Sequence, residues 1–511
     1  MLALSGLWYK IGSMNLRTDW THKTKSQRQE SLVRLISGHE HEIALDYISL
    51  VSTGHQGVYA SMGPNFTYAI FGRDSIEVAE DLLTTHQSLV RDIIFTLARL
   101  QGVKNDNTTE EEPGKIHHEY RSRVFDGELI SEESLAVVHN LQRWWGGIGT
   151  DEMVYYGSFD ATPLYIRLVY SYSQHYDQSI LDEKYVARNG RSQTILDSLW
   201  AATDWLVTKI EQSPWKLLEY KRMNPNGLLN QVWKDSGTAY LHVDGTIANG
   251  DGGIAAVELQ GYAYDALLAA AHLLNNRTPQ ATHFLALARN VQQATLEQLW
   301  MPEFQFFAQG LDRDTNGATR QIKTLTSNGA LLLQSQLLKN LPDNTKRTYC
   351  EAIAKMICSS EFLTESGIRC RALRHKDIPG FVDYHGTYTV WPKETFDVAN
   401  GLLQHGYAHL ANQFTNRILR SVEIAGDFYE LFYVEDDGKV WYDSTAALDH
   451  FSKKSPADYL PIPEPGQAWV ISAVLSILSN RDELSNHKVD TFEKQLLQTI
   501  PEVYPLKMST S

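Results

Sequence analysis

Apolar residues recur at helical spacing along most of the chain. Between positions 88 and 102 they fall on one helical face, with Ser88 before the run and Gly102 after it. An N-cap residue, an apolar stripe and a terminal glycine together predict an amphipathic helix. Positions 257–274 repeat the pattern with many alanines, which indicates close packing against neighbours. Further helices are predicted over 26–38, 74–86, 161–175, 192–211, 281–300, 327–339, 345–358, 394–410, 413–425, 466–480 and 489–499.

Strand signals are few and short. Residues 58–60 and 66–70 flank a Gly-Pro-Asn turn and predict a hairpin, and the aromatic-rich residues 428–442 around Asp436-Asp437-Gly438 predict another. Residues 104–113 form a polar loop, and no Pro-, Gly- or Ser-rich linker divides the chain. The predicted fold class is therefore all-α, with short β-hairpins in the loops of one large domain.

Charge and composition narrow the function. The 511 residues carry 46 Lys and Arg against 61 Asp and Glu, a net charge of −15, which disfavours nucleic acid or an anionic membrane as partner. No apolar run reaches the roughly 18–20 residues of a membrane-spanning helix. The three cysteines, Cys350, Cys358 and Cys370, match neither a CxxC zinc pattern nor an even-numbered disulfide framework. With no signal peptide pattern at the N-terminus, we expect a cytoplasmic protein.

Two acidic residues stand in unusual surroundings. Asp235 follows Trp233 in the segment 230–237, and a carboxyl beside a large aromatic side chain can keep its proton near neutrality as a general acid. Alternatively, Asp235 could have a structural role in an Asx turn, because the sequence Asp-Ser-Gly favours turns. Glu430 is a lone acid among apolar residues, and buried Glu is rare without a partner. Alternatively, Glu430 could lie on a strand with its side chain facing solvent.

Candidate ligand contacts lie between the helices. Arg73 and Asp74 could grip neighbouring hydroxyls, but Asp74 with Glu77 also matches a capping box. Loops rich in aromatic and polar residues suggest a polar ligand, although each one alone is more often core packing. These loops contain Trp144-Trp145-Gly146, Tyr156 with Asp160, Trp233, Tyr384 with His385, Trp391, and Gln467 with Trp469.

Other chemistries fit the sequence less well. It contains no GxxxxGK[ST], GxGxxG, HExxH or GxSxG motif, which argues against nucleotide, metalloprotease and α/β-hydrolase sites. Residues 244–252 lack the order of an EF-hand loop, and His117 and His118 are adjacent, so they do not have the i,i+4 spacing of a helical zinc site. We expect neither a metal nor an organic cofactor.

Nine segments, in order along positions 55–480, resemble the glucosidase domain of glycogen debranching enzymes and bacterial amylo-α-1,6-glucosidase-like proteins. More distantly they are similar to glucoamylase-type and processing-glucosidase-type hydrolases, which share an (α/α)6 barrel. The segments are 71–75, 114–121, 156–164, 230–237, 257–262, 325–328, 384–392, 429–432 and 467–469. The resemblance implies that 51–505 form an (α/α)6-barrel catalytic domain, preceded by an extension and first helix over 1–50.

The resemblance also implies roles for individual residues. Asp235 matches the general acid and Glu430 the general base of an inverting glycosidase, 195 residues apart (430 − 235) in sequence. Arg73 and Asp74 match the pair that holds the sugar at the non-reducing end and makes the enzyme exo-acting. Residues at sugar-contacting or supporting positions are His118, Glu119, Asp160, Gln260, Tyr384 and His385.

The chain departs from the family in two places. Phe-Tyr-Glu replaces the common Leu-Pro-Glu before Glu430, which leaves Glu435 and Glu464 as alternative bases. Since only about 50 residues precede the region of resemblance, we expect the chain to lack the β-rich N-terminal domain of debranching relatives, which favours short or compact α-glucosides, sugar–glycerate compounds among them, over glycogen. The expected activity is that of an exo-acting α-glucosidase. A glycoside phosphorylase and a non-hydrolytic carbohydrate-binding protein on the same barrel are the alternatives.

Overall fold

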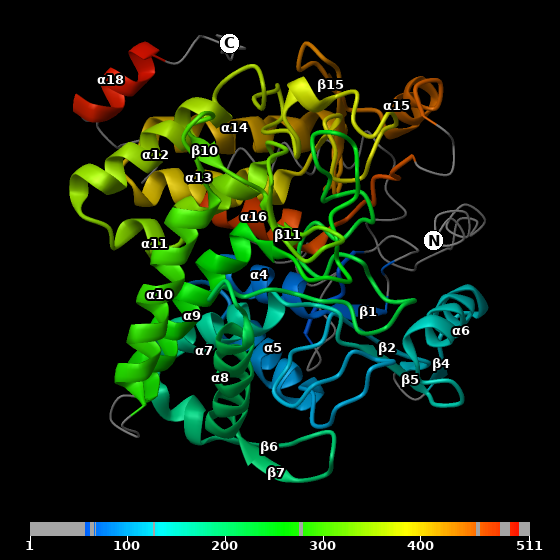
Figure 1. Cartoon of the computed structure of the whole chain (residues 1–511). Helices are drawn as coiled ribbons and strands as arrows, with labels where there is room; N and C mark the ends of the chain where they lie inside the picture. Colours follow the sequence, from blue (N-terminus) through cyan, green and yellow to red (C-terminus); the bar gives the residue numbers. More distant parts are fainter. Residues whose placement is uncertain are drawn as a thin grey trace.

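The computed structural model describes residues 57–61, 66, 68–125, 128–274, 280–455, 460–480 and 491–499. The predicted extension over 1–50 and the helix at 26–38 lie outside these ranges. Within them the chain is largely helical with small sheets (Figure 1). No helix of this part combines the length and the apolar character needed to cross a bilayer.

Six inner helical elements contact one another in a closed cycle. They are α4 (Gly72–Asp81), α7 (Ala161–His175), α9 (Val257–Leu274), the 3-10 helix η4 (Ser327–Gln334), α13 (Pro392–Gln404) and α16 (Ala468–Ser479). Each packs against the next in this order, and α16 packs against α4. In α9 every residue except Leu268 and His272 is buried, as expected for a helix that is apolar on all sides.

Five further helices pack outside this cycle. They are α5 (Gln87–Leu100), α8 (Ile195–Gln212), α10 (Ala281–Leu299), α12 (Asp343–Ile357) and α14 (Ala408–Ala425). Helix α5 contacts α4 and α7, α8 contacts α7 and α9, and α10, α12 and α14 contact α9, η4 and α13 respectively. These helices are two-sided: in α5, Ile93 and Leu97 are buried while Gln87 and Arg99 are exposed. Figure 1 shows α10 at the edge of the molecule and α4 and α16 near its middle.

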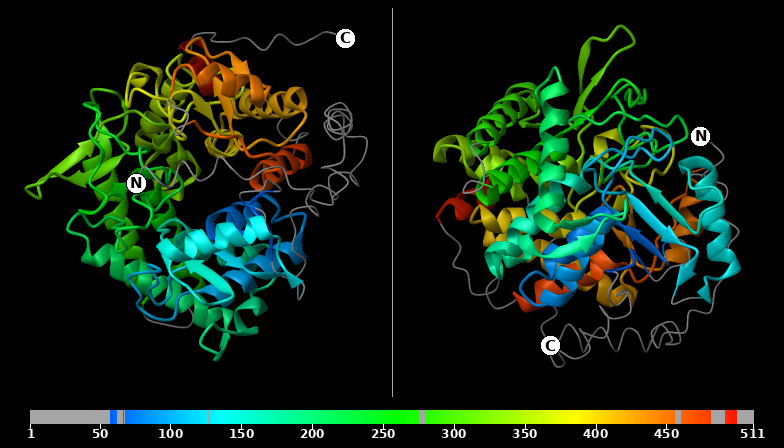
Figure 2. Two further views of the ribbon diagram at one scale, coloured as in Figure 1. Left: turned by 90° about the vertical axis from the view of Figure 1, so that its right-hand side faces the viewer. Right: turned by 90° about the horizontal axis from the view of Figure 1, so that it is seen from below.

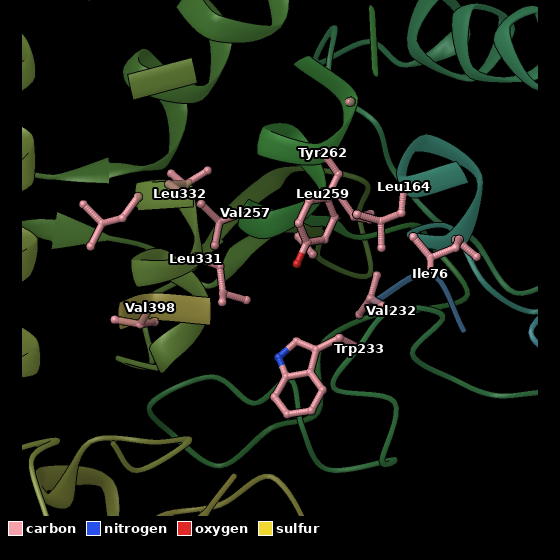
Figure 3. Packing of buried hydrophobic residues seen from close by; sticks show 14 of the residues in the cluster. Ile76, Leu164, Val232, Trp233, Val257, Leu259, Tyr262, Leu331, Leu332 and Val398 are labelled. Carbon is pink, nitrogen blue, oxygen red and sulfur yellow. The ribbon is translucent and has the colours of Figure 1, made fainter. Parts of the chain in front are cut away.

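The main core cluster is formed by the inner elements together with the helices packed outside them. Figure 3 shows Ile76, Leu164, Leu259, Leu331 and Val398, which come from α4, α7, α9, η4 and α13, around one common interior. Trp233 lies at the edge of this core, on the loop between α8 and the next strand. One continuous core therefore fixes the relative positions of helix ends that are far apart in sequence.

Small sheets and short helices occupy the connections. In the first sheet β2 (Glu119–Ser122) lies between β1 (Ala69–Phe71) and β5 (Glu152–Tyr155), and in another β14 (Phe432–Val434) lies between β13 (Thr389–Val390) and β15 (Val440–Trp441). Figure 2 (left) shows the first sheet and helix α6 (Glu132–Trp145) on one face of the molecule. The remaining elements are β3 (Val124–Phe125), β4 (Glu128–Leu129), β6 (Lys184–Val186), β7 (Ser192–Thr194), β8 (Ala255–Ala256), β9 (Trp300–Met301), β10 (Phe306–Phe307), β11 (Gly310–Arg313), β12 (Thr319–Ile322), η3 (Gln178–Asp182), α11 (Gln336–Lys339), η5 (Leu373–His375), α15 (Ser444–Phe451) and α18 (Thr491–Thr499).

Most predicted elements are confirmed. The segments 88–102 and 257–274 are α5 and α9, and 428–442 contains the antiparallel pair β14–β15. The prediction of one continuous helix over 327–339 is wrong. Asp265 accepts hydrogen bonds from Ser335 Oγ and Gln336 N there and breaks the segment into η4 and the single turn α11.

Two further predictions differ from the structure. The ladder partner of β1 is β2 and not the segment 58–60. In that segment Ala60 N donates to Ala69 O at 3.2 Å, and Ala60 O accepts from Ala468 N at 2.8 Å. The sequence patterns do not predict helix α6, and Trp144 and Trp145 form its last turn and not a loop.

Candidate active site

A pocket of about 590 Å³ opens where the N-terminal ends of inner helices meet. Arg73 and Asp74 line it from the first turn of α4, Trp391 from the position before α13, and Trp469 from the first turn of α16. Its volume lies within the range of about 300–1,000 Å³ that is typical of small-molecule sites. Asp235 and Glu430 both line this pocket.

Asp235 lies on the loop between α8 and β8, and its side chain is 27% exposed. Arg73 Nη2 lies 3.8 Å from Asp235 Oδ2. Burial raises the pKa of Asp235 to about 7, Arg73 opposes this rise, and the carboxylates of Asp74 and Asp160 add to it. Asp235 therefore retains a proton at a pH where an ordinary aspartate is ionised.

Glu430 lies in the pocket wall between α14 and β14 and is only 4% exposed, so its interpretation as an outward-facing strand residue is wrong. The hydroxyl of Tyr384 donates to Glu430 Oε2, and Gln467 Nε2 donates to Oε1 at 3.2 Å. Burial raises the pKa of Glu430 well above its usual range, and the neighbouring carboxylates, Glu464 first, raise it further. The hydrogen bond from Tyr384 opposes this rise because it stabilises the ionised form.

Arg73 joins three carboxylates on one side of the pocket. Its Nη1 donates to Asp160 Oδ2 at 3.1 Å, and its Nη2 lies 3.6 Å from Asp74 Oδ2 and 3.8 Å from Asp235 Oδ2. Ser158 Oγ fixes Asp160 from behind at 2.5 Å. Asp160 therefore orients the guanidinium toward the two carboxyls that line the pocket.

Asp74 is not a helix cap. Helix α4 begins two residues before Asp74, at Gly72, with Phe71 as its N-cap and no side-chain capping hydrogen bond. The capping interpretation of Asp74 and Glu77 is therefore wrong, and Asp74 is free to face the pocket. Burial raises the pKa of Asp74 to about 6.

Aromatic rings form one wall of the pocket. Trp233 makes edge-to-face contacts with Trp391 at 5.0 Å, His385 at 5.2 Å and Trp469 at 5.9 Å between ring centroids. His385 Nδ1 lies 3.0 Å from Ser236 Oγ, and burial lowers the pKa of His385 well below its usual value, so this ring is neutral. The wall offers apolar faces together with a few polar atoms, which is the character of a site for a small polar ligand.

The structure brings most of the predicted contacts together. His118, Glu119 and Tyr384 line the pocket with the residues described above. Glu119 is also held by Arg121 Nε. Of the alternative bases, Glu464 lines the pocket, whereas Glu435 is bonded to Trp441 and Lys454 away from it.

Three predicted contacts do not reach the pocket. Asp160 lies behind Arg73. The Tyr156 hydroxyl donates to Leu100 O at 2.7 Å and accepts from Arg188 Nη1 at 2.7 Å. Gln260 holds the backbone of Leu218 through hydrogen bonds of 2.9 Å to both its N and its O. These polar groups are satisfied by the protein itself, so their part in the site is support and not contact.

Lys234 anchors the loop that carries Asp235. Its fully buried ammonium donates to Ser327 Oγ at 2.5 Å and to Cys370 O at 3.0 Å, and it lies 3.1 Å from Glu394 Oε1. Ser327 begins η4 and Glu394 lies in the first turn of α13, so one cation ties the loop to two inner elements. No sequence pattern marks Lys234 for this role, although it stands beside the predicted acid.

Comparison with known proteins shows similarity in fold only. No protein-family model matches the chain, and no curated protein matches it significantly. Among solved structures, a GH63 mannosylglycerate hydrolase from Thermus thermophilus in complex with glucose aligns with 86% of this chain and 99% of its own, at a TM-score of 0.53 and 15% identity. The same enzyme with Tris and D-glycerate covers 89% of this chain and all of its own (100%), at a TM-score of 0.51 and 13% identity. A structure titled "Glycosidase Wild Type" covers 89% and 98%, at a TM-score of 0.51 and 13% identity. The chain therefore shares the fold of these glycoside hydrolases.

Proposed function

We propose that this protein is an inverting, exo-acting α-glycosidase built on an (α/α)6 barrel, an α-glucosidase that acts on short or compact α-glucosides. The closed cycle of inner elements and the shared fold of glycoside hydrolases support the barrel. One observation carries the function: two carboxyls 195 residues apart (430 − 235) line one pocket, between aromatic rings and an arginine. A single catalytic domain over 51–505 and a cytoplasmic location belong to the same proposal.

Asp235 acts as the general acid in this mechanism. It protonates the glycosidic oxygen, and its pKa of about 7 keeps the proton available at neutral pH. As the bond breaks, Asp235 becomes an anion, which the guanidinium of Arg73 at 3.8 Å stabilises. The same arginine with Asp74 would hold hydroxyls of the terminal sugar and close the inner end of the pocket.

Glu430 acts as the general base. In its ionised form it activates a water molecule that attacks the anomeric carbon from the face opposite the leaving group, and the configuration inverts. Such enzymes hold their two carboxyls about 6.5–9.5 Å apart to leave room for this water. Tyr384 and Gln467 donate to both oxygens of Glu430, so they support the charged form and fix its orientation.

The test is to compare Asp235→Asn and Glu430→Gln with wild type on aryl α-glucosides and short α-glucans. Each variant is expected to lose about 10²–10⁴-fold in kcat, the usual contribution of a general acid or base. Glu435→Gln is the matched control, because Glu435 is bonded to Trp441 and Lys454 outside the pocket. Near-wild-type turnover in either pocket variant would overturn the proposed roles. A phosphorylase requires a cationic phosphate site, and Arg73 is the only Lys or Arg among the described residues that line the pocket.

A further inference from the structure

We infer that the outer part of the pocket is a site for an apolar leaving group, so that the enzyme cleaves alkyl or aryl glycosides in preference to charged ones. This inference rests on the proposed function and adds the substrate class. It starts from five apolar side chains that line the pocket while remaining in part open to solvent: Phe66, Leu228, Ile247, Phe381 and Ile462. We refer to these five residues as the apolar mouth.

The apolar mouth lies outside the polar part of the site. Ile247 is 49% exposed, whereas Arg73, Trp233, Trp391 and Glu430 are each 8% exposed or less. Ile247 therefore lies nearer the entrance of the pocket than these polar and aromatic groups. The pocket is also lined by the buried apolar residues Leu141, Trp145, Leu229 and Leu460.

The size of the pocket leaves room beyond the sugar. One pyranose fills only part of about 590 Å³. In an exo-acting enzyme the terminal sugar occupies the deep end, so the leaving group lies against the outer wall. Apolar side chains exposed together in a concave site mark a binding surface for an apolar group.

The charges of the pocket disfavour an anionic leaving group. Among the described lining residues Arg73 is the only Lys or Arg, and Asp160, Asp74 and Asp235 already surround it at 3.1–3.8 Å. The two histidines of the pocket, His118 and His385, have pKa values lowered by burial, so neither offers a positive charge. The D-glycerate present in the Thermus complex would find no free cation among these residues.

The entrance is held in place by buried contacts. Arg371 donates to Thr238 O at 3.0 Å, to Ile378 O at 2.8 Å and to Asp383 Oδ2 at 2.6 Å. It therefore clamps the loop after Asp235 to the loop that carries Phe381. A Cβ at Gly245 would lie 3.9 Å from Ile378 Cγ2, so the loop of Ile247 also lies against this segment. A preformed apolar surface binds its ligand with little loss of conformational entropy.

The experiment compares methyl, butyl, hexyl and octyl α-D-glucosides, which share one sugar and similar leaving-group acidity, together with an α-glucoside of glycerate. Wild-type kcat/KM is expected to rise up to about fourfold for each methylene that becomes buried. Ile247→Asn and Phe381→Ala should flatten this rise when kcat/KM for each glucoside is expressed relative to the same variant's kcat/KM for the methyl glucoside. Val243→Asn is the matched control, since Val243 is 51% exposed in the same loop and does not line the pocket.

The outcomes separate the two proposals. A flat series, or faster cleavage of the glycerate compound, overturns the apolar site while hydrolysis of methyl glucoside still supports the proposed function. Absence of hydrolysis of every glycoside overturns the proposed function itself. If kcat/KM rises with alkyl chain length but Val243→Asn abolishes this rise as strongly as Ile247→Asn does, the assignment of this surface is also overturned.

Discussion

Replacing Tyr384 by Phe removes the hydroxyl that donates to Glu430 Oε2 and leaves the aromatic ring in the wall. A hydrogen bond to a charged group contributes about 1.5–3 kcal/mol. At about 1.36 kcal/mol per pKa unit, its loss should raise the pKa of Glu430 by about one to two units. Because the proposed base works in its ionised form, Tyr384→Phe is expected to lose about 10- to 100-fold in kcat/KM at acid pH.

The assay is the pH dependence of kcat/KM for wild type and Tyr384→Phe on one aryl α-glucoside. The deficit should be largest on the acid side and shrink as the pH rises, since high pH ionises Glu430 without help. Tyr156→Phe is the control, because its hydroxyl bonds Leu100 and Arg188 outside the pocket. An equal loss at every pH, or no loss, would refute the argument that Tyr384 sets the charge of Glu430.

Three more predictions concern acidity and stability. With the Asp235 pKa at about 7, wild-type kcat/KM should fall as the pH rises through that value, and a profile still rising well above it would contradict the role of Asp235 as acid. Lys234→Met leaves the buried Glu394 without its cation and should destabilise the fold by about 3–5 kcal/mol in guanidinium unfolding, with recovery in Lys234→Met/Glu394→Gln. If the double variant is no more stable than Lys234→Met, the ion pair is not the cause. Burial raises the folded-state pKa of Asp265 to about 7, above the unfolded value, so the stability that Asp265 contributes at low pH should be lost as the pH rises toward 7. Asp265→Asn should therefore reduce the pH dependence of the free energy of unfolding. An unchanged pH dependence in this variant would contradict the prediction.

The positions of most helices, and the apolar faces that they bury, could be predicted from the sequence. Helix α9 is apolar and alanine-rich, and it lies buried in the inner cycle, while α5 carries one apolar stripe and packs outside that cycle. These features depend only on local periodicity. The break at Ser335 was not readable, because the carboxylate of Asp265 that causes it comes from another helix.

Site residues could be predicted from the sequence where both their chemical type and their sequence neighbours are unusual. Asp235 and Glu430 stood out as acids beside aromatic residues, and both line the pocket. Tyr156 was predicted from its aromatic and polar neighbours and Gln260 from the family resemblance, yet their polar atoms bond Leu100 and Leu218 and do not line the pocket. Ile247 and Phe381 carried no signal, because an apolar residue in a loop acquires a role only when distant loops form a common wall.

The most direct measurement is proton NMR of the sugar that wild-type enzyme first releases from an α-glucoside. The mechanism requires Asp235 and Glu430 to act from opposite faces of the anomeric carbon with water between, and so predicts that β-glucose appears first and then mutarotates. Initial release of α-glucose would contradict that geometry and with it the assignment of Glu430 as the base.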